Sequence, residues 1–110
     1  MALTRGFSPS QFRDKILGSI GPIPVNATIP STAAGANGKV TIAVSATLGL
    51  VVGDILFVIP QGAALVDGVD VEAVVLTSTS VSLVAHNGSG SIYNPGAANF
   101  VLVGFRFNQA

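Results

Sequence analysis

The stretch LVVGDILFVIP, residues 50–60, decides the fold class of this chain. Gly53 and Asp54 predict a tight turn, and every residue of the run that follows, Ile55–Ile59, is apolar. A short apolar run bounded by turn residues is typical of a buried strand, and apolar side chains on both faces predict that it is sandwiched between layers. Pro60 ends the run because proline cannot donate a hydrogen bond to a neighbouring strand.

Further runs with β character lie on both sides of this strand. Lys39–Thr47 and Asn99–Phe107 alternate residue by residue between two faces. Asp70–Thr77 and Val81–Ala85 are joined by only the short link 78–80, so they are predicted to form a hairpin. Short strands separated by Gly- and Pro-containing turns indicate an all-β fold, a small β-sandwich or barrel-like domain. The predicted core comprises Val40, Ile42, Val44, Ile55, Phe57, Ile59, Val74, Leu76, Val81, Leu83, Leu102 and Val103.

The N-terminal part of the chain differs from the rest. It is predicted to be an arm, residues 1–38, in front of a β body, residues 39–110. The sequence Ser8-Pro9-Ser10-Gln11 has the spacing of a helix start: a side-chain cap, a proline in the first turn and a residue that reaches back. It predicts one short helix over about residues 9–17.

A helix of this length is not stable alone, so its apolar side must pack on another surface. Phe12, Ile16 and Leu17 are the expected anchors, and Phe7 has the spacing of a hydrophobic staple with Phe12. The basic side chains beside them are expected to meet acidic groups of the partner. The residues predicted to bind a partner chain are Phe7, Phe12, Arg13, Lys15, Ile16 and Leu17.

The Pro- and Gly-rich stretch after this helix, residues 20–37, is predicted to be an irregular, extended connector. Within it, residues 25–29 are a candidate edge strand. An extended link of this kind is long enough to reach a neighbouring subunit. We therefore expect residues 1–30 to contact another chain, either a sister copy or a different protein.

Charge is scarce in this chain. Only 9% of its residues are charged and 49% are hydrophobic, with a net charge of zero, whereas ordinary domains carry about a quarter charged residues. Too little charge remains to keep a free monomer dispersed, so other subunits are expected to cover part of the surface, in a homotrimer. The expected contacts are the apolar strand faces and the loop around residues 62–69. Because there is no basic face and no apolar run of about 20 residues, neither nucleic acid nor a membrane is expected as a partner.

The few charges are unevenly distributed. Arg5, Arg13 and Lys15 lie in the arm against a single acid, Asp14, while the other acids lie between residues 54 and 72. A basic arm and an acidic body are complementary between copies, and such complementarity sets register. The alternative is that the arm charges only keep a docked helix soluble, since isolated exposed ion pairs are weak.

Residue types that carry catalysis are few. The chain has no cysteine, and its one histidine, His86, lies beside a Gly/Ser loop, residues 86–91, that is predicted to be flexible. Asp67, Asp70 and Glu72 are a candidate cation set, but they lack the oxygen-rich alternation of a calcium loop. The sequence therefore predicts that the protein is not an enzyme and has no catalytic, cofactor or metal site.

A series of short motifs runs from Lys39 to the end of the chain. They are Val40-Thr41-Ile42, Leu50–Val58, Asp70–Val75, Ser80–Leu83, Asn87, Asn94-Pro95 and Phe100–Val103. In this order they resemble a recurring domain of tailed-bacteriophage structural proteins. In such proteins a Leu-x-Val-Gly-Asp turn opens a hydrophobic strand, and a hairpin precedes an Asn-containing loop and a terminal strand.

The resemblance implies a virion component, most like a small capsid decoration (cement) protein. Many such proteins are trimers that bind between subunits of the major capsid protein through an extended N-terminal arm. That location implies synthesis in the host cytoplasm and a final position on the capsid surface. A tail or baseplate component is the alternative within the structural class, and a host-surface or carbohydrate-binding module is the alternative outside it. The latter is disfavoured by scarce aromatic residues, because Tyr93 is the only tyrosine and there is no tryptophan.

Overall fold

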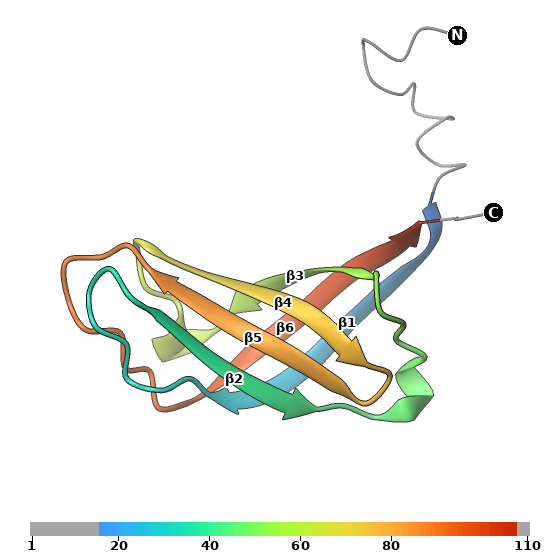
Figure 1. The fold of residues 1–110 in the computed structure, drawn as a ribbon, viewed down its shortest axis with the longest axis horizontal. Helices are drawn as coiled ribbons and strands as arrows, with labels where there is room; N and C mark the ends of the chain where they lie inside the picture. The colour runs from blue at the N-terminus through green and yellow to red at the C-terminus, as the bar shows by residue number, and fades with distance from the viewer. Residues whose placement is uncertain (1–15, 108–110) are drawn as a thin grey trace, which may run out of the picture.

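The computed structural model describes residues 16–107, which form one curled antiparallel sheet, a half-barrel (Figure 1). The strands are β1 (Ile16–Thr28), β2 (Asn37–Ala43), β3 (Ile55–Pro60), β4 (Val69–Thr77), β5 (Ser80–Asn87) and β6 (Ala97–Phe107). They are arranged in the order β1-β6-β3-β4-β5-β2, so β1 and β2 are the two edges. The prediction of an all-β fold is confirmed, and the sheet is curled on itself without closing.

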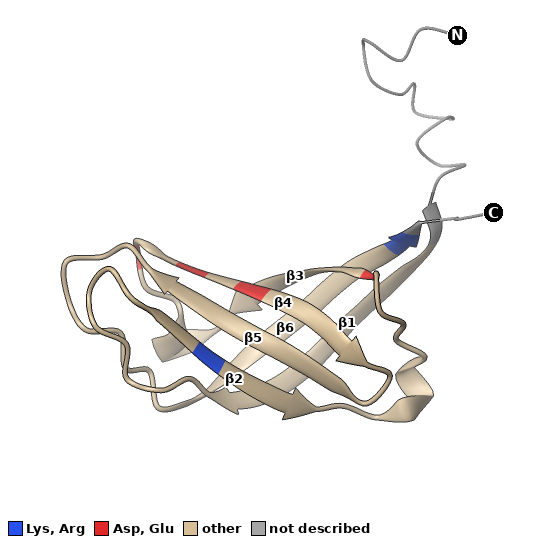
Figure 2. Ribbon diagram, viewed as in Figure 1, with Lys and Arg blue, Asp and Glu red and all other residues tan. Residues whose placement is uncertain are grey.

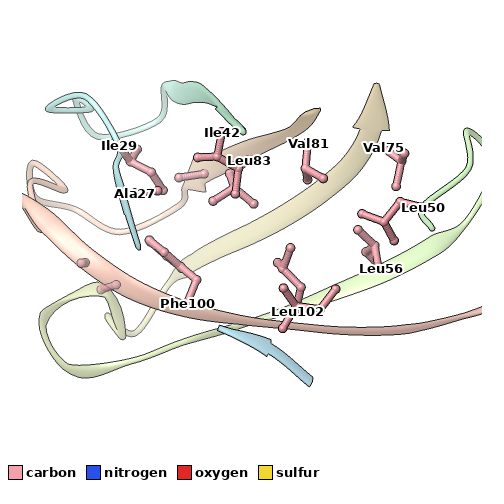
Figure 3. Packing of buried hydrophobic residues seen from close by; sticks show 14 of the residues in the cluster. Ala27, Ile29, Ile42, Leu50, Leu56, Val75, Val81, Leu83, Phe100 and Leu102 are labelled. Carbon is pink, nitrogen blue, oxygen red and sulfur yellow. The ribbon is translucent and has the colours of Figure 1, made fainter. Parts of the chain in front are cut away.

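The concave side of the sheet holds the core. Curling brings Phe100 and Leu102 of β6 opposite Val81 and Leu83 of β5, with Ile42 of β2 beside them (Figure 3). These side chains are buried because the two halves of the sheet cover each other across the concavity, as two packed layers would. The other buried hydrophobic residues are Ile23, Ala27, Ile29, Leu50, Leu56, Ala64, Val75, Ala85, Tyr93 and Ala98.

Most predicted strands are present. Residues 55–59 are in β3, the β4–β5 hairpin has the predicted tight connection, and β6 contains the predicted last strand. The strand predicted over Lys39–Thr47 is shorter. It ends at Ala43 because Ser45 caps a single 3₁₀ turn that follows.

The N-terminal prediction is wrong in part. Ile16 and Leu17 were assigned to the helix but are the first residues of β1, and the supposed connector over residues 20–28 is strand as well. The rest of the predicted helix, residues 9–15, lies outside the described residues. β1 pairs with β6 along its length, from Ile16 opposite Phe107 to Thr28 opposite Ala97. The sheet therefore begins at residue 16, upstream of the predicted boundary between arm and body. The candidate edge strand is confirmed and is longer than expected.

Two prolines and a glycine explain why β1 was not predicted. Pro22 and Pro24 are tolerated because β1 is an edge strand, where one side of the backbone needs no partner. The pairing with β6 shifts between Ile20 and Ile23. Gly21 lies in that shift with φ +81°, and a Cβ there would collide with the Leu102 carbonyl. This irregularity is part of the strand.

The predicted core was right for β2 and β5, right for one of its two residues in β6, and wrong for β3 and β4. Ile42, Val81, Leu83 and Leu102 are buried, and Val40 and Val44 pack against the core. Val103 is only half-buried. The remaining predicted core residues are exposed: Ile55, Phe57, Ile59, Val74 and Leu76.

Candidate interaction surface

Strand β3 is apolar on both faces, and only one face is covered. Leu56 is buried on the concave side, and Val58 packs against the core there. Because side chains alternate along a strand, Ile55, Phe57 and Ile59 point to the convex side. Phe57 is 55% exposed. An exposed row of large apolar side chains on a sheet face is an unusual feature of a monomer surface.

Strand β6 extends this row across the sheet. Ile55, Phe57 and Ile59 lie opposite Phe105, Val103 and Val101, in that order. The rings of Phe57 and Phe105 are 6.1 Å apart at a tilt of 45°, within the range of favourable aromatic pairs. We call these residues the outer apolar face: Ile55, Phe57, Ile59, Val101, Val103 and Phe105.

Strand β4 borders this face with one more apolar residue and two acids. Phe57 lies opposite Glu72, and Asp70 and Val74 point to the same side as Glu72. All three β4 side chains are exposed. Figure 2 shows the acidic positions on β4 and one basic position on the edge strand β2, where Lys39 lies two strands from Glu72 in the same cross-strand row. The outer apolar face therefore has a carboxylate rim along β4.

The histidine belongs to this rim. His86 Nε2 is 2.7 Å from Glu72 Oε1, and His86 Nδ1 is 3.0 Å from Asn37 Oδ1. Both contacts are on the surface, and they cross-link β4, β5 and β2 outside the core. Of the three acids considered as a cation set, Glu72 is thus engaged by a histidine. Within residues 16–107, no group of three His, Cys, Asp or Glu side chains is placed to hold a metal ion.

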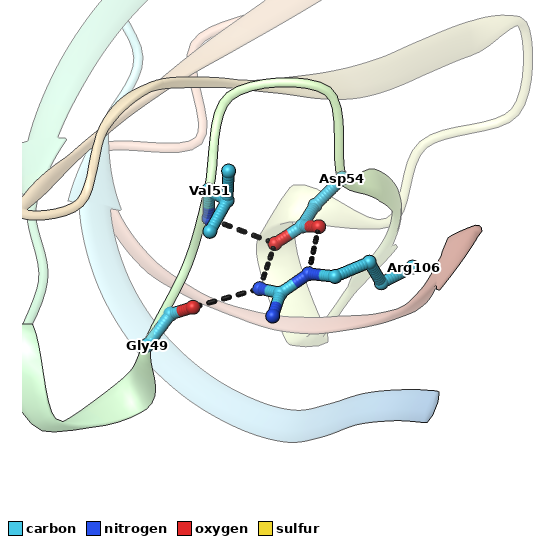
Figure 4. A network of polar contacts seen from close by, with 4 residues as sticks. All are labelled: Gly49, Val51, Asp54 and Arg106. Carbon is cyan, nitrogen blue, oxygen red and sulfur yellow. Dashed lines mark hydrogen bonds and ion pairs between the residues drawn. The ribbon is translucent and has the colours of Figure 1, made fainter. Parts of the chain in front are cut away.

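An ion pair on the concave side fixes the turn before β3. Arg106 donates from Nε to Asp54 Oδ1 at 2.6 Å and from Nη2 to Asp54 Oδ2 at 2.7 Å, and Nη2 also donates to the Gly49 carbonyl at 2.7 Å (Figure 4). Asp54 Oδ2 accepts from the Val51 N–H at 2.9 Å. The hydrogen bonds from Arg106 lower the pKa of Asp54, and those to Asp54 raise the pKa of Arg106. The cluster therefore ties the end of β6 to the turn before β3.

A buried asparagine organises the loop after β5. Asn87 Nδ2 donates to the carbonyls of Thr32 and Ser91, at 3.0 and 2.8 Å, and Asn87 Oδ1 accepts two hydrogen bonds from Ser89. Nearby, Tyr93 is 2% exposed, and its hydroxyl donates to the Ala64 carbonyl at 2.7 Å. The loop predicted to be flexible thus begins with two strand residues and is tied down by Asn87. Sequence reasoning missed this role, since the Gly and Ser residues of the loop predicted only flexibility.

Most of the residues predicted to bind a partner lie outside the part of the chain that the structure describes. Phe7, Phe12, Arg13 and Lys15 lie outside the described residues, so the structure does not test them. Ile16 and Leu17 lie in β1 of the sheet, where Ile16 pairs with Phe107 of β6 in its own chain. Apolar strand faces were expected to make contacts between copies, but this face was not identified, because its β3 residues and Val103 had been assigned to the core.

Comparison with known proteins found no similar protein: no family model matches the chain, and neither does any curated protein or solved structure. Over residues 16–107, no helix is long and apolar enough to cross a membrane. The outer apolar face and its carboxylate rim are therefore the features from which a function is inferred.

Proposed function

We propose that the protein is a non-enzymatic structural subunit whose outer apolar face is covered in an assembled particle. The observation that carries the proposal is the row of exposed apolar side chains shared by β3 and β6, with Phe57 more than half exposed. Burying such a patch against another protein removes apolar area from water, which is the main driving force of association. The low charge of the whole chain points in the same direction.

The particle we propose is a tailed-bacteriophage virion. The support is the resemblance of the segment from Lys39 onward to structural proteins of such phages. In this role, homotrimers decorate the capsid surface and stabilise it by binding between subunits of the major capsid protein. A tail or baseplate location is the second form of the same proposal, since an oligomer held together through the outer apolar face suits either location.

A carbohydrate-binding role has less support from the structure. Protein sites for sugars generally present exposed aromatic rings, and the only tyrosine, Tyr93, is buried with its hydroxyl bonded to Ala64. Among the other described rings, Phe100 is fully buried and Phe57 lies in the outer apolar face. That face has a continuous aliphatic surface around its rings, which suits a protein partner better than a sugar.

Capsid binding is the direct test of this proposal. Wild-type protein mixed with expanded phage capsids should co-sediment with them, and Phe57→Asp should lose this binding because a charge is placed in the apolar contact. Ile92→Asp is the matched control, since Ile92 is also exposed but lies in a loop outside the outer apolar face. Circular dichroism should show the same β spectrum for all three proteins. Equal loss of binding by both variants, or none by either, would contradict the proposal.

A further inference from the structure

The outer apolar face needs an occupant with apolar anchors and positive charge. Its centre is apolar, and its β4 side carries the carboxylates of Asp70 and Glu72. Residues 16–107 contain four acidic residues and only two basic ones, Lys39 and Arg106. Arg106 is already paired with Asp54. The surface around the face is therefore acidic, and a basic partner is favoured there.

The first fifteen residues of the chain have this composition. They contain three basic residues against one acid, and two phenylalanines, Phe7 and Phe12. The positive excess of this segment equals the negative excess of residues 16–107, so the two parts are complementary while the whole chain is neutral. Aromatic anchors next to basic residues match an apolar face with an acidic rim.

The short reach of residues 13–15 from Ile16 makes a second copy the better source of this segment. Glu72 lies three strands from β1 and about four residues along β6 from the Ile16–Phe107 pair, a separation of about 19 Å at usual strand spacings. Lys15 and Arg13 are one and three residues before Ile16, so their Cα atoms lie within about 4 and 11 Å of it. Lys15 Cα therefore stays about 15 Å or more from Glu72 Cα of its own sheet, which is farther than the two side chains span. Arg13 can approach that rim within its own chain, so only a segment from a second copy places both basic residues there.

We propose that the outer apolar face binds residues 1–15 of a second copy of this chain, with Phe7 and Phe12 on the apolar centre and Arg13 and Lys15 at the Asp70–Glu72 rim. This inference rests on the proposed assembly and specifies its contact. Each copy gives one segment and receives another, and in the proposed homotrimer this makes the interface head-to-tail within a closed ring. A ring of three copies would leave no outer apolar face uncovered.

Disulfide trapping tests this contact cleanly because the chain has no cysteine. The double variant Gln11→Cys/Ile59→Cys puts one thiol in the segment and one on the face. Oxidation should give covalent dimers and larger species on a denaturing, non-reducing gel, since the two thiols meet only between copies. The single variants Gln11→Cys and Ile59→Cys show whether a disulfide forms between the same position of two copies. Gln11→Cys/Ile92→Cys is the matched control, because Ile92 is exposed in a loop outside the outer apolar face, and it should stay a single chain.

The outcomes separate this inference from the proposed assembly. A disulfide within one chain, or equal trapping by the Ile92 control, would overturn the exchange of segments. The exchange of segments would also be overturned if no covalent product formed while light scattering still showed an oligomer. In that case the proposed contact is wrong and the proposed assembly stands. A wild-type protein that is a monomer by light scattering would overturn both the contact and the assembly.

Discussion

Asp54 is a nearly buried acid whose charged form is stabilised by two groups. Arg106 donates two hydrogen bonds to its carboxylate and the Val51 N–H donates a third. The Asp54 side chain is 1% exposed, so little water competes for these bonds. They join the end of β6 to the turn before β3, and thereby hold the first residue of the outer apolar face in place.

The pKa shift of Asp54 predicts how stability depends on pH. Because the pKa is lowered in the folded protein, this carboxylate contributes stability above its unfolded pKa of about 4, and the contribution is lost as the pH falls through the folded value. Asp54→Asn should lower the free energy of unfolding by about 1.5–3 kcal/mol at pH 7. The difference from wild type should shrink below about pH 4.

Urea unfolding between pH 2 and 7 measures this difference. Asp67→Asn is the control, because Asp67 is an exposed acid in a turn. It should leave the free energy of unfolding close to the wild-type value at every pH. If Asp54→Asn and wild type differed by a constant amount over the whole range, the ion pair would not be the source of the pH dependence.

Sequence patterns located most of the strands, but they did not identify which face of β3 and of β4 is buried. In β3 every residue from Ile55 to Ile59 is apolar, so alternation cannot say which side is buried. In β4 the signal was present, because Asp70 and Glu72 alternate with Val71 and so assign Val71, Ala73 and Val75 to the inside. The curl of the sheet decides which face of β3 is buried. This curl depends on pairing between strands that are far apart in the sequence.

The edge strand β1 shows a different limit of sequence reasoning. Proline is a strong local signal against a regular strand, and Pro22 and Pro24 therefore predicted an irregular link. Pairing with β6 overrides this signal, because proline needs no partner on an open edge. The N-terminal segment was predicted to be the partner-binding device, and the surface that we propose receives it became visible only in the folded sheet.

Substitutions on the two faces of β3 should lower the free energy of unfolding by different amounts. Leu56→Ala removes a buried side chain and should lower the free energy of unfolding of the single chain by about 2–5 kcal/mol. Phe57→Ala removes a side chain that is more than half exposed, so the cost to the single chain should be about 1 kcal/mol. Urea unfolding in dilute solution, where subunits are dissociated, provides the comparison. A larger loss for Phe57→Ala than for Leu56→Ala would place the wrong side of β3 in the core.

At the scale of the whole molecule, the half-barrel has two features that a free monomer does not need. The first is the outer apolar face, and the second is the pair of strand edges that the open sheet leaves. A groove of about 410 Å³ separates these edges and is lined by residues 23–26 of β1 and by residues 42–45 and Leu48 at the end of β2. Pro22 and Pro24 protect the β1 edge from pairing with another strand, so association is directed to the convex face.

The central claim is that copies of this chain cover the outer apolar face. Sedimentation equilibrium at micromolar concentration tests it most directly, with wild type compared with Phe57→Asp. We expect wild type to sediment at three times the chain mass of 11.0 kDa and Phe57→Asp to sediment as a single chain with an unchanged β spectrum. A wild-type protein that stays a soluble single chain over this range would contradict the account.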